Sequence, residues 1–153
     1  MQNNSQENIK KKFGTVKSKT FSLISLNGEK ISTASLKNKV IVLDFWATWC
    51  APCMASFPAM QQVINEYKND TNVVFLFIDT WEYKTPKTMV ENAKTFLKKN
   101  NYTFQILFDE ENKIVEKFKV DAIPYKFIIN KVGEIVFMDD SIDIALEIEN
   151  AKR

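Results

Sequence analysis

Two apolar runs dominate the hydrophobic pattern of the chain. The first, VIVLDFW at residues 40–46, is rich in β-branched residues and predicts a buried strand. The second, NVVFLFID at residues 72–79, predicts a strand buried on both faces and therefore parallel to a neighbour. Over residues 51–68 the apolar positions instead follow a period near four, which is typical of a helix. Pro58 lies inside this helix and is expected to kink or interrupt it.

The remaining pattern divides into shorter elements. Residues 21–32 predict a hairpin, because Asn27-Gly28 suits a two-residue turn in which both residues have positive φ. Thr85-Pro86 is typical of a helix N-cap followed by the first helical residue. The other expected elements are a helix ending near residue 99, a strand at 105–108, a helix at 110–118, strands at 125–129 and 134–138 joined by a turn, and a final helix from about residue 141 with Ile142, Ala145, Leu146 and Ile148 buried.

This order of elements predicts an α/β fold. Helices alternate with strands in the middle and a hairpin stands at each end, which favours a central mixed β-sheet flanked by helices on both faces. The 153 residues suffice for one domain with a sizeable core. Residues 1–19 are polar and unpatterned, so we expect a disordered leader or linker there and a folded domain over 20–153.

Charge and composition remove several classes of function. The net charge is +2, and residues 1–19 hold five lysines against Glu7, which indicates a solvated tail rather than a nucleic-acid site. The chain has no histidine, which excludes Ser-His-Asp and Cys-His catalysis and histidine-bound metals. Its two cysteines, Cys50 and Cys53, are too few for a four-ligand zinc site, so no metal is expected and redox chemistry is favoured.

The two cysteines lie where the strand at 40–46 gives way to the helix at 51–68. Cys50 would stand at the first turn of that helix. Unpaired backbone N–H groups and the positive end of the helix dipole stabilise an anion at such a position, and a thiolate is an anion. Cys50 is therefore a candidate nucleophile.

The segment VLDFWATWCAPC resembles the active site of the thioredoxin superfamily, and VDAIPYKFIINKVGEIV resembles that superfamily's X-Pro loop and the hairpin after it. NYTFQILFD, the additional helix and strand between residues 80 and 108, and the N-terminal hairpin are similar to its extracytoplasmic TlpA/ResA branch. The resemblance runs from Phe21 to the C-terminus. It implies a thioredoxin-like fold with an inserted helix–strand unit.

The resemblance also implies a thiol–disulfide oxidoreductase. Cys50, exposed at the helix N-terminus, would attack a client disulfide and Cys53 would resolve the mixed disulfide. The pair itself is then the redox group, and no cofactor is expected. The partners would be protein thiols or disulfides and an upstream electron donor. Ala51 and Pro52, between the cysteines, carry neither charge nor imidazole, which favours a reductant over an oxidant.

Two acidic residues are candidates for proton transfer. Asp44 lies in an apolar strand and matches the buried acid of thioredoxin, which implies a proton acceptor for Cys53; the alternative is a carboxylate that caps a neighbouring amide. The lysine that thioredoxin carries near that acid would align with Phe75 and is missing. Glu82 is the second candidate, with a solvated loop carboxylate as its alternative.

Other residues are expected to form the surface around the cysteines. The resemblance implies that Pro124 follows a cis peptide bond and that Ile123 is an apolar neighbour of Cys50. Trp49 is expected at the surface beside Cys50, and Trp46 in the core. Together with Ala51 and Pro52, the residues Trp49, Ile123 and Pro124 make up the expected substrate-binding surface.

Compartment and competing functions stay open at this point. No apolar run is long enough for a membrane span, and residues 1–20 lack the apolar centre of a secretory signal, so the chain is either cytoplasmic or a mature or shortened form. The resemblance implies an extracytoplasmic monomer, with membrane contact only through an anchor preceding this sequence. One alternative is a peroxiredoxin-like thiol peroxidase, although Ala47 stands where that family has threonine; the other is a non-catalytic binding module.

Overall fold

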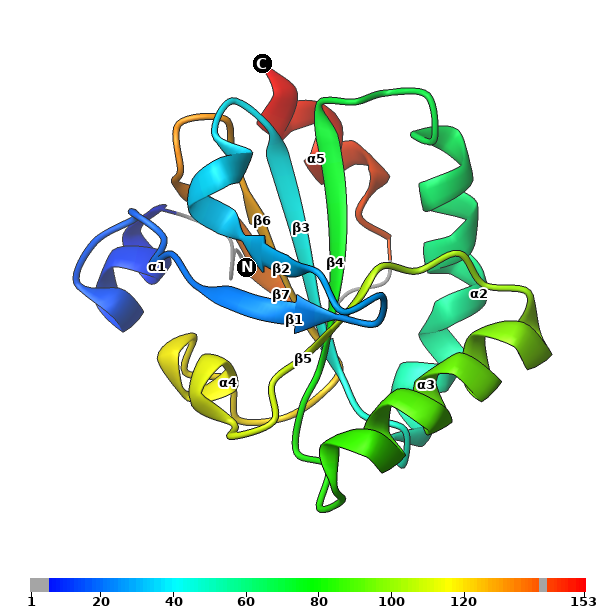
Figure 1. Cartoon of the computed structure of the whole chain (residues 1–153). Coiled ribbons are helices and arrows are strands. Elements are labelled where there is room, and N and C mark those ends of the chain that lie inside the picture. Colours follow the sequence, from blue (N-terminus) through cyan, green and yellow to red (C-terminus); the bar gives the residue numbers. More distant parts are fainter. Residues whose placement is uncertain (1–5, 141–142) are drawn as a thin grey trace.

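Three parallel strands form the middle of the sheet, as the computed structural model of residues 6–140 and 143–153 shows (Figure 1). The described strands form one sheet in the order β2-β1-β5-β4-β3-β6-β7. Their bounds are β1 Ser22–Ser25, β2 Lys30–Ser32, β3 Val40–Trp46, β4 Val73–Asp79, β5 Ile106–Phe108, β6 Tyr125–Ile129 and β7 Ile135–Asp139. Strands β3, β4 and β5 are parallel, and β1, β6 and β7 are antiparallel to their neighbours, so the predicted mixed sheet is confirmed.

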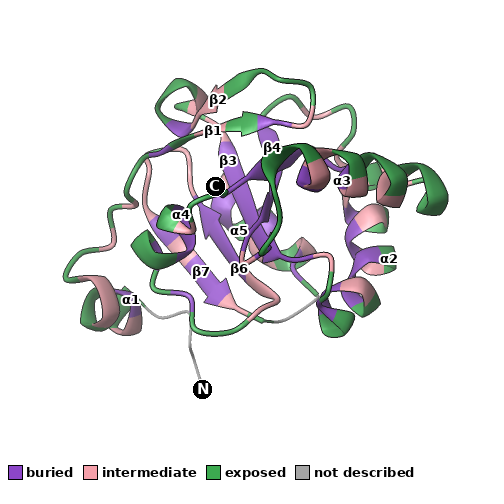
Figure 2. Cartoon of the chain, turned by 60° about the horizontal axis from the view of Figure 1, so that its bottom comes forward, coloured by how far each residue is buried: buried purple, intermediate pink, exposed green. Residues whose placement is uncertain are grey.

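Helices cover both faces of this sheet (Figure 2). One face carries α2, α3 and α5, and the other carries α1 and α4. Their bounds are α1 Gln6–Phe13, α2 Ala51–Glu66, α3 Pro86–Asn100, α4 Lys113–Lys117 and α5 Ala145–Lys152, with a 3-10 turn at Thr33–Leu36. The inserted unit is α3 with β5. None of the helices in the described ranges is long and apolar enough to cross a membrane.

The alternation of side chains along β3 divides the core into two clusters. Val40, Val42 and Trp46 pack toward α2, whereas Ile41 and Phe45 pack toward α1 and α4. Every residue of β3 is buried, which explains why the sequence shows a continuous apolar run here rather than alternation. The alternation also decides where Asp44 points: it lies between Val42 and Trp46 in this pattern and faces α2.

Two local predictions need correction. The N-terminal hairpin is present, but its loop has three residues, because Ser25 N–H donates to Glu29 O (2.7 Å). Only Gly28 has positive φ (83°), and Asn27 does not, so the expected two-residue turn is wrong. Pro58 does not interrupt α2, which continues to Glu66.

The expectation of a disordered leader over 1–19 is wrong for its described part. Residues 6–13 form α1, and Ile9 is fully buried in the cluster against α4. The chain then pairs with the last hairpin, since Ile135 N–H donates to Val16 O (2.7 Å). The polar composition hid this helix, because a short helix needs only Ile9 and the half-buried Phe13, one turn apart, to attach its inner face.

The last two helices also differ from expectation. Helix α4 spans only residues 113–117, and Asp109 holds its first turn by accepting from Ile114 N–H (3.0 Å) and Val115 N–H (2.9 Å). The predicted start of the final helix at 141, with Ile142, lies outside the described residues. Ile148 is buried as expected, but Leu146 is exposed, because it lies on the outer face of α5.

Candidate active site

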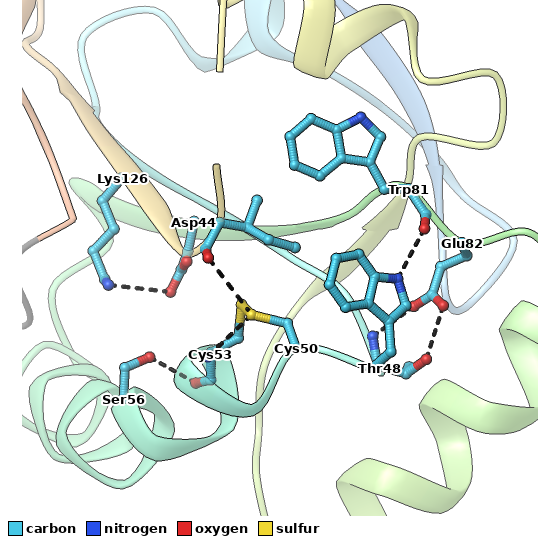
Figure 3. Close-up of a disulfide and its surroundings, with 10 residues drawn as sticks. Asp44, Thr48, Cys50, Cys53, Ser56, Trp81, Glu82 and Lys126 are labelled. Atoms are coloured by element: carbon cyan, nitrogen blue, oxygen red, sulfur yellow. Dashed lines mark hydrogen bonds and ion pairs between the residues drawn. A yellow bond between two sulfur atoms is a disulfide. The ribbon is translucent and has the colours of Figure 1, made fainter. Parts of the chain in front are cut away.

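Cys50 and Cys53 form a disulfide at the N-terminus of α2 (Figure 3), with their Cα atoms 5.3 Å apart. Cys50 is the N-cap residue, and its sulfur accepts a hydrogen bond from Cys53 N–H (3.2 Å). The backbone of this turn therefore already donates to the Cys50 sulfur. A thiolate formed there on reduction would keep that donor and the favourable end of the helix dipole.

Cys50 is less accessible than expected. It is only 3% exposed, and Cys53 is fully buried, because both belong to the apolar cluster between β3 and α2. Trp49, at 57%, and the exposed Ala51 and Pro52 provide the surface beside the pair. The prediction of an exposed Cys50 is therefore wrong, although the residues on either side of it reach solvent.

The loop before β6 lies directly against the disulfide. The Ile123–Pro124 peptide bond is cis, in the conformation that the sequence predicts. The carbonyl oxygen of Ile123 is 3.7 Å from Cys50 Sγ, and the Ile123 side chain packs against both core clusters. The structure thus brings Ile123 and Pro124 together with the cysteine pair.

Asp44 lies on the α2 side of the sheet, beside the disulfide in Figure 3. The carboxylate is almost completely buried, and burial raises the pKa of Asp44 to about 6, while the charge of Lys126 lowers it. Asp44 Oδ2 is 3.9 Å from Lys126 Nζ. This distance makes an ion pair without a hydrogen bond, so Asp44 is not a capping carboxylate.

The basic partner of Asp44 is a residue that the local sequence pattern does not reveal. The resemblance to thioredoxin implies such a partner only at the position aligned with Phe75, on β4. The partner comes instead from β6, where Lys126 stands directly opposite Asp44 in the antiparallel register and is fully buried. The available signal was a lysine within the apolar strand YKFII, which is unfavourable unless an opposite charge accompanies it.

Glu82 lies on the other side of the disulfide from Asp44 (Figure 3). The carboxylate is buried, so the expectation of a solvated loop carboxylate is wrong. It accepts from Thr48 N–H (2.6 Å) and from Thr48 Oγ1 (2.8 Å). Glu82 thus ties the loop after β4 to the segment that leads into Cys50, and its observed partners are the atoms of Thr48 rather than the cysteines.

A third buried acid completes this end of the sheet. Asp79 ends β4 and is fully buried, and its two carboxyl oxygens have no hydrogen-bond partner within the described part of the chain. Burial, together with the negative charge of the nearby Glu82, raises the pKa of Asp79 to about 10. Asp79 is therefore protonated at neutral pH.

Comparison with known proteins places the chain in a family. Residues 15–138 match the AhpC/TSA family, and the chain belongs to it. The thiol–disulfide oxidoreductase ResA of Bacillus cereus is 32% identical over 116 residues, which cover 76% of this chain and 63% of that protein. The chain therefore spans somewhat less than two thirds of the length of this relative.

Solved structures confirm the thioredoxin-like fold. A thiol:disulfide interchange protein of Chlorobium tepidum superimposes with a TM-score of 0.76 over 90% of this chain and 97% of its own, at 23% identity. A secreted disulfide oxidoreductase of Mycobacterium tuberculosis gives a TM-score of 0.70 over 85% of this chain and 95% of its own, at 26% identity.

The protonated state of Asp79 leads to a pH-dependent stability. The folded chain keeps this proton up to about pH 10, whereas the carboxyl of the unfolded chain loses it near pH 3.8. Between these values folding takes up a proton, so the contribution of Asp79 to the free energy of unfolding falls by at most about 1.4 kcal/mol per pH unit as pH rises. Asp79→Asn keeps the size of the side chain and has no proton to lose.

We therefore expect Asp79→Asn to be more stable than the natural chain at pH 8.5, by about 1 kcal/mol or more, with the advantage shrinking toward pH 5. Urea unfolding at a series of pH values measures this difference. The exposed Asp121→Asn is the matched control and should show no such trend. An effect of Asp79→Asn that is equal at every pH would mean that the folded chain does not hold this proton.

Proposed function

We propose that this chain is a thiol–disulfide oxidoreductase that reduces disulfides in client proteins. The observation that carries the proposal is the Cys50–Cys53 disulfide at the N-terminus of α2, packed against the cis Ile123–Pro124 loop. The name of the relative ResA and membership of the family support the same reaction.

The proposed cycle transfers two electrons. In the reduced pair, the Cys50 thiolate attacks one sulfur of a client disulfide, forms a mixed disulfide, and expels the other client sulfur as a thiolate, which takes up a proton. Cys53 then loses its proton and attacks the Cys50 sulfur. This step releases the second client thiolate and leaves Cys50 and Cys53 oxidised. A dithiol donor upstream restores the reduced pair by the same exchange in reverse.

Asp44 is the proposed base for Cys53. It lies on the same side of the sheet as the disulfide, and with a pKa of about 6 it is mostly ionised at neutral pH while still able to accept a proton. Lys126 is a positioning residue in this scheme. Burial raises the pKa of Asp44, and the charge of Lys126 limits that rise. The cation on β6 thus takes the role expected of a lysine on β4.

The surroundings of Cys50 favour reduction over oxidation of clients. A strongly oxidising pair needs a very stable thiolate, and the apolar cluster that buries Cys50 contains no cation to add to the stabilisation from the helix N-terminus. Ala51 and Pro52 add neither positive charge nor imidazole between the cysteines. The proposed direction is therefore electron donation to the client.

The clients are proposed to be proteins outside the cytoplasm. Persistent disulfides are a feature of oxidising compartments, and one of the structural relatives is a secreted disulfide oxidoreductase. Trp49, Ala51 and Pro52 are exposed beside the buried cysteine pair and offer a surface that a client protein can contact. This supports protein disulfides as the substrates. No nucleic acid enters this scheme.

Single cysteine variants test the cycle. In Cys53→Ser the mixed disulfide with a client cannot be resolved, so a covalent complex should accumulate and dissolve on addition of dithiothreitol. Cys50→Ser lacks the attacking sulfur and should form none. Non-reducing gel electrophoresis with insulin as client measures both. Multiple-turnover reduction by both single variants at the natural rate would remove the proposal, and efficient turnover of hydrogen peroxide in place of insulin would favour a thiol peroxidase.

The pH profile of single-turnover insulin reduction tests Asp44 and Lys126. The rate should rise with pH through about 6, as Asp44 becomes able to accept the Cys53 proton. Asp44→Asn should be at least roughly tenfold slower at pH 8, without this transition. In Lys126→Met the pKa of Asp44 rises, so the transition should move to higher pH.

The control for this profile is Lys113→Met, which removes an exposed lysine from α4. It should leave the transition in place. An unchanged profile in Lys126→Met would show that the charge of Lys126 does not act on the reaction, and a normal transition in Asp44→Asn would assign it to another group.

A further inference from the structure

A pocket opens at the end of the sheet opposite the cysteine pair. The residues that line it come mainly from three segments, 18–20, 33–39 and 129–133. Figure 1 shows the turn between β6 and β7 at one end of the sheet and the start of α2, where the cysteines lie, at the other. The pocket has a volume of about 360 Å³, within the range of about 300–1,000 Å³ that is usual for small-molecule sites. It is therefore large enough for a small ligand.

Backbone hydrogen bonds hold the walls of this pocket together. Asn38 N–H donates to Lys131 O (3.2 Å), and Ser18 N–H donates to Gly133 O (2.9 Å). The turn between β6 and β7 is thus bound to both of the other walls, although the three segments are far apart in the sequence. A ligand would find the pocket already formed and would lose little free energy in ordering it.

The inner side of the pocket is apolar. Ile41 and Ile129 line it, stand opposite each other in the pairing of β3 with β6, and are each only 4% exposed. Leu36 lines it as well and packs against the same buried cluster. An apolar chain that enters the pocket would leave water and contact these side chains, which is favourable.

Positive charge surrounds this apolar interior. Four lysines line the pocket, Lys19, Lys37, Lys39 and Lys131, and none of the lining residues is acidic. Lys39 Nζ donates to Thr71 O (2.6 Å), so its ammonium group already has a partner. The ammonium groups of the other three lysines form no ion pair within the described part of the chain. They are therefore available to an anion from outside.

The acidic residues near the pocket are engaged elsewhere. Asp70, which lies close enough to Lys131 to interact with its charge, already accepts a hydrogen bond from Lys152 Nζ (2.7 Å). Glu134 follows the pocket turn, and its Oε1 accepts from Asn130 Nδ2 (3.4 Å). Neither carboxylate lines the pocket. The charge of the lining residues is thus complementary to an anionic ligand.

We propose that this lysine-rimmed pocket binds small amphipathic anions, in which one carboxylate ends an apolar chain. This inference goes beyond the proposed function, because it concerns the other end of the sheet. The apolar chain would lie against Ile41 and Ile129. The carboxylate would stay at the rim, where the long flexible side chains of Lys19, Lys37 and Lys131 can bring their ammonium groups to it.

Octanoate, 1-octanol and acetate are the probes that separate the two halves of this ligand. Titration of the full chain with each probe, followed through amide chemical shifts in two-dimensional NMR spectra, gives both affinity and location. With octanoate we expect saturable changes centred on residues 18–20, 33–41 and 129–133. Octanol, which lacks the charge, should bind at least roughly threefold more weakly. Acetate, which lacks the chain, should give no saturable change.

Ala34→Trp tests the location of the site. Ala34 is an exposed residue of the 3-10 turn that lines the pocket, so an indole there would occupy the space of the ligand. We expect at least about tenfold weaker octanoate binding. Ser35→Trp is the matched control, because Ser35 is the next residue, is also exposed, and is not among the lining residues. Its affinity should be that of the natural chain.

Lysine variants test the recognition of the carboxylate. Lys37→Met and Lys131→Met should each weaken octanoate binding roughly two- to fivefold and leave octanol binding unchanged. The control is Lys99→Met, which removes an exposed lysine from α3 on the other face of the sheet and should change neither affinity.

Several results would overturn the proposal. These are equal affinity for octanol and octanoate, natural octanoate affinity in Ala34→Trp, or shift changes centred on Trp49 and Ile123 at the cysteine end. The absence of saturable octanoate binding up to about 10 mM would overturn it as well. Insulin reduction by the same protein is measured separately, so failure of the pocket leaves the oxidoreductase function in place, and failure to reduce insulin leaves the pocket in place.

Discussion

The hydrogen bond from Cys53 N–H to the Cys50 sulfur is the contact on which the site depends. It exists because β3 ends one short loop before α2 begins, so the first free N–H groups of the helix meet the sulfur of its own N-cap residue. Both elements are fixed by burial, since β3 is enclosed on both faces and α2 packs its inner side on the same cluster. The helix terminus therefore cannot move away from the sulfur without disturbing the core.

The same end of the sheet collects charges that are expensive to bury. Four buried ionisable residues lie near the carboxyl ends of the parallel strands: Asp44, Asp79, Glu82 and Lys126. The cost of burying each acidic side chain is offset in a different way. Asp44 has a cation opposite it, Asp79 keeps its proton, and Glu82 accepts hydrogen bonds from Thr48. Such groups reduce stability compared with an apolar core, so their concentration around one disulfide indicates a functional role. The rest of the sheet, with long apolar runs, supplies the stability that this end lacks.

The fold was predictable from the sequence wherever burial gives a continuous or periodic apolar pattern. The strands β3 and β4, the N-terminal hairpin and the helix opened by Thr85 and Pro86 were all found in this way. Helix α1 was not predicted, because only Ile9 and Phe13 attach it to the core and the rest of the segment is polar. The three-residue loop at Gly28 was not predicted, because the dipeptide Asn27-Gly28 suits a two-residue turn and also a longer loop.

Only those features of the candidate site that depend on the local sequence were predictable. The cysteine pair and the cis proline follow from a local motif. Lys126 depends on the register between β3 and β6, and the burial of Glu82 depends on the left-handed turn at Trp81; both are properties of the folded chain. The burial of Cys50 likewise follows from how the cis loop and α2 pack together.

The reduction potential of the Cys50–Cys53 pair tests the central claim most directly. Equilibration of the protein with graded glutathione and dithiothreitol buffers, followed by separation of the oxidised and reduced forms, gives this value. A donor of electrons to client disulfides should have a potential near or below about −250 mV. A potential above roughly −150 mV would make the pair an oxidant, and failure to form an intramolecular disulfide at any buffer ratio would contradict the dithiol mechanism itself.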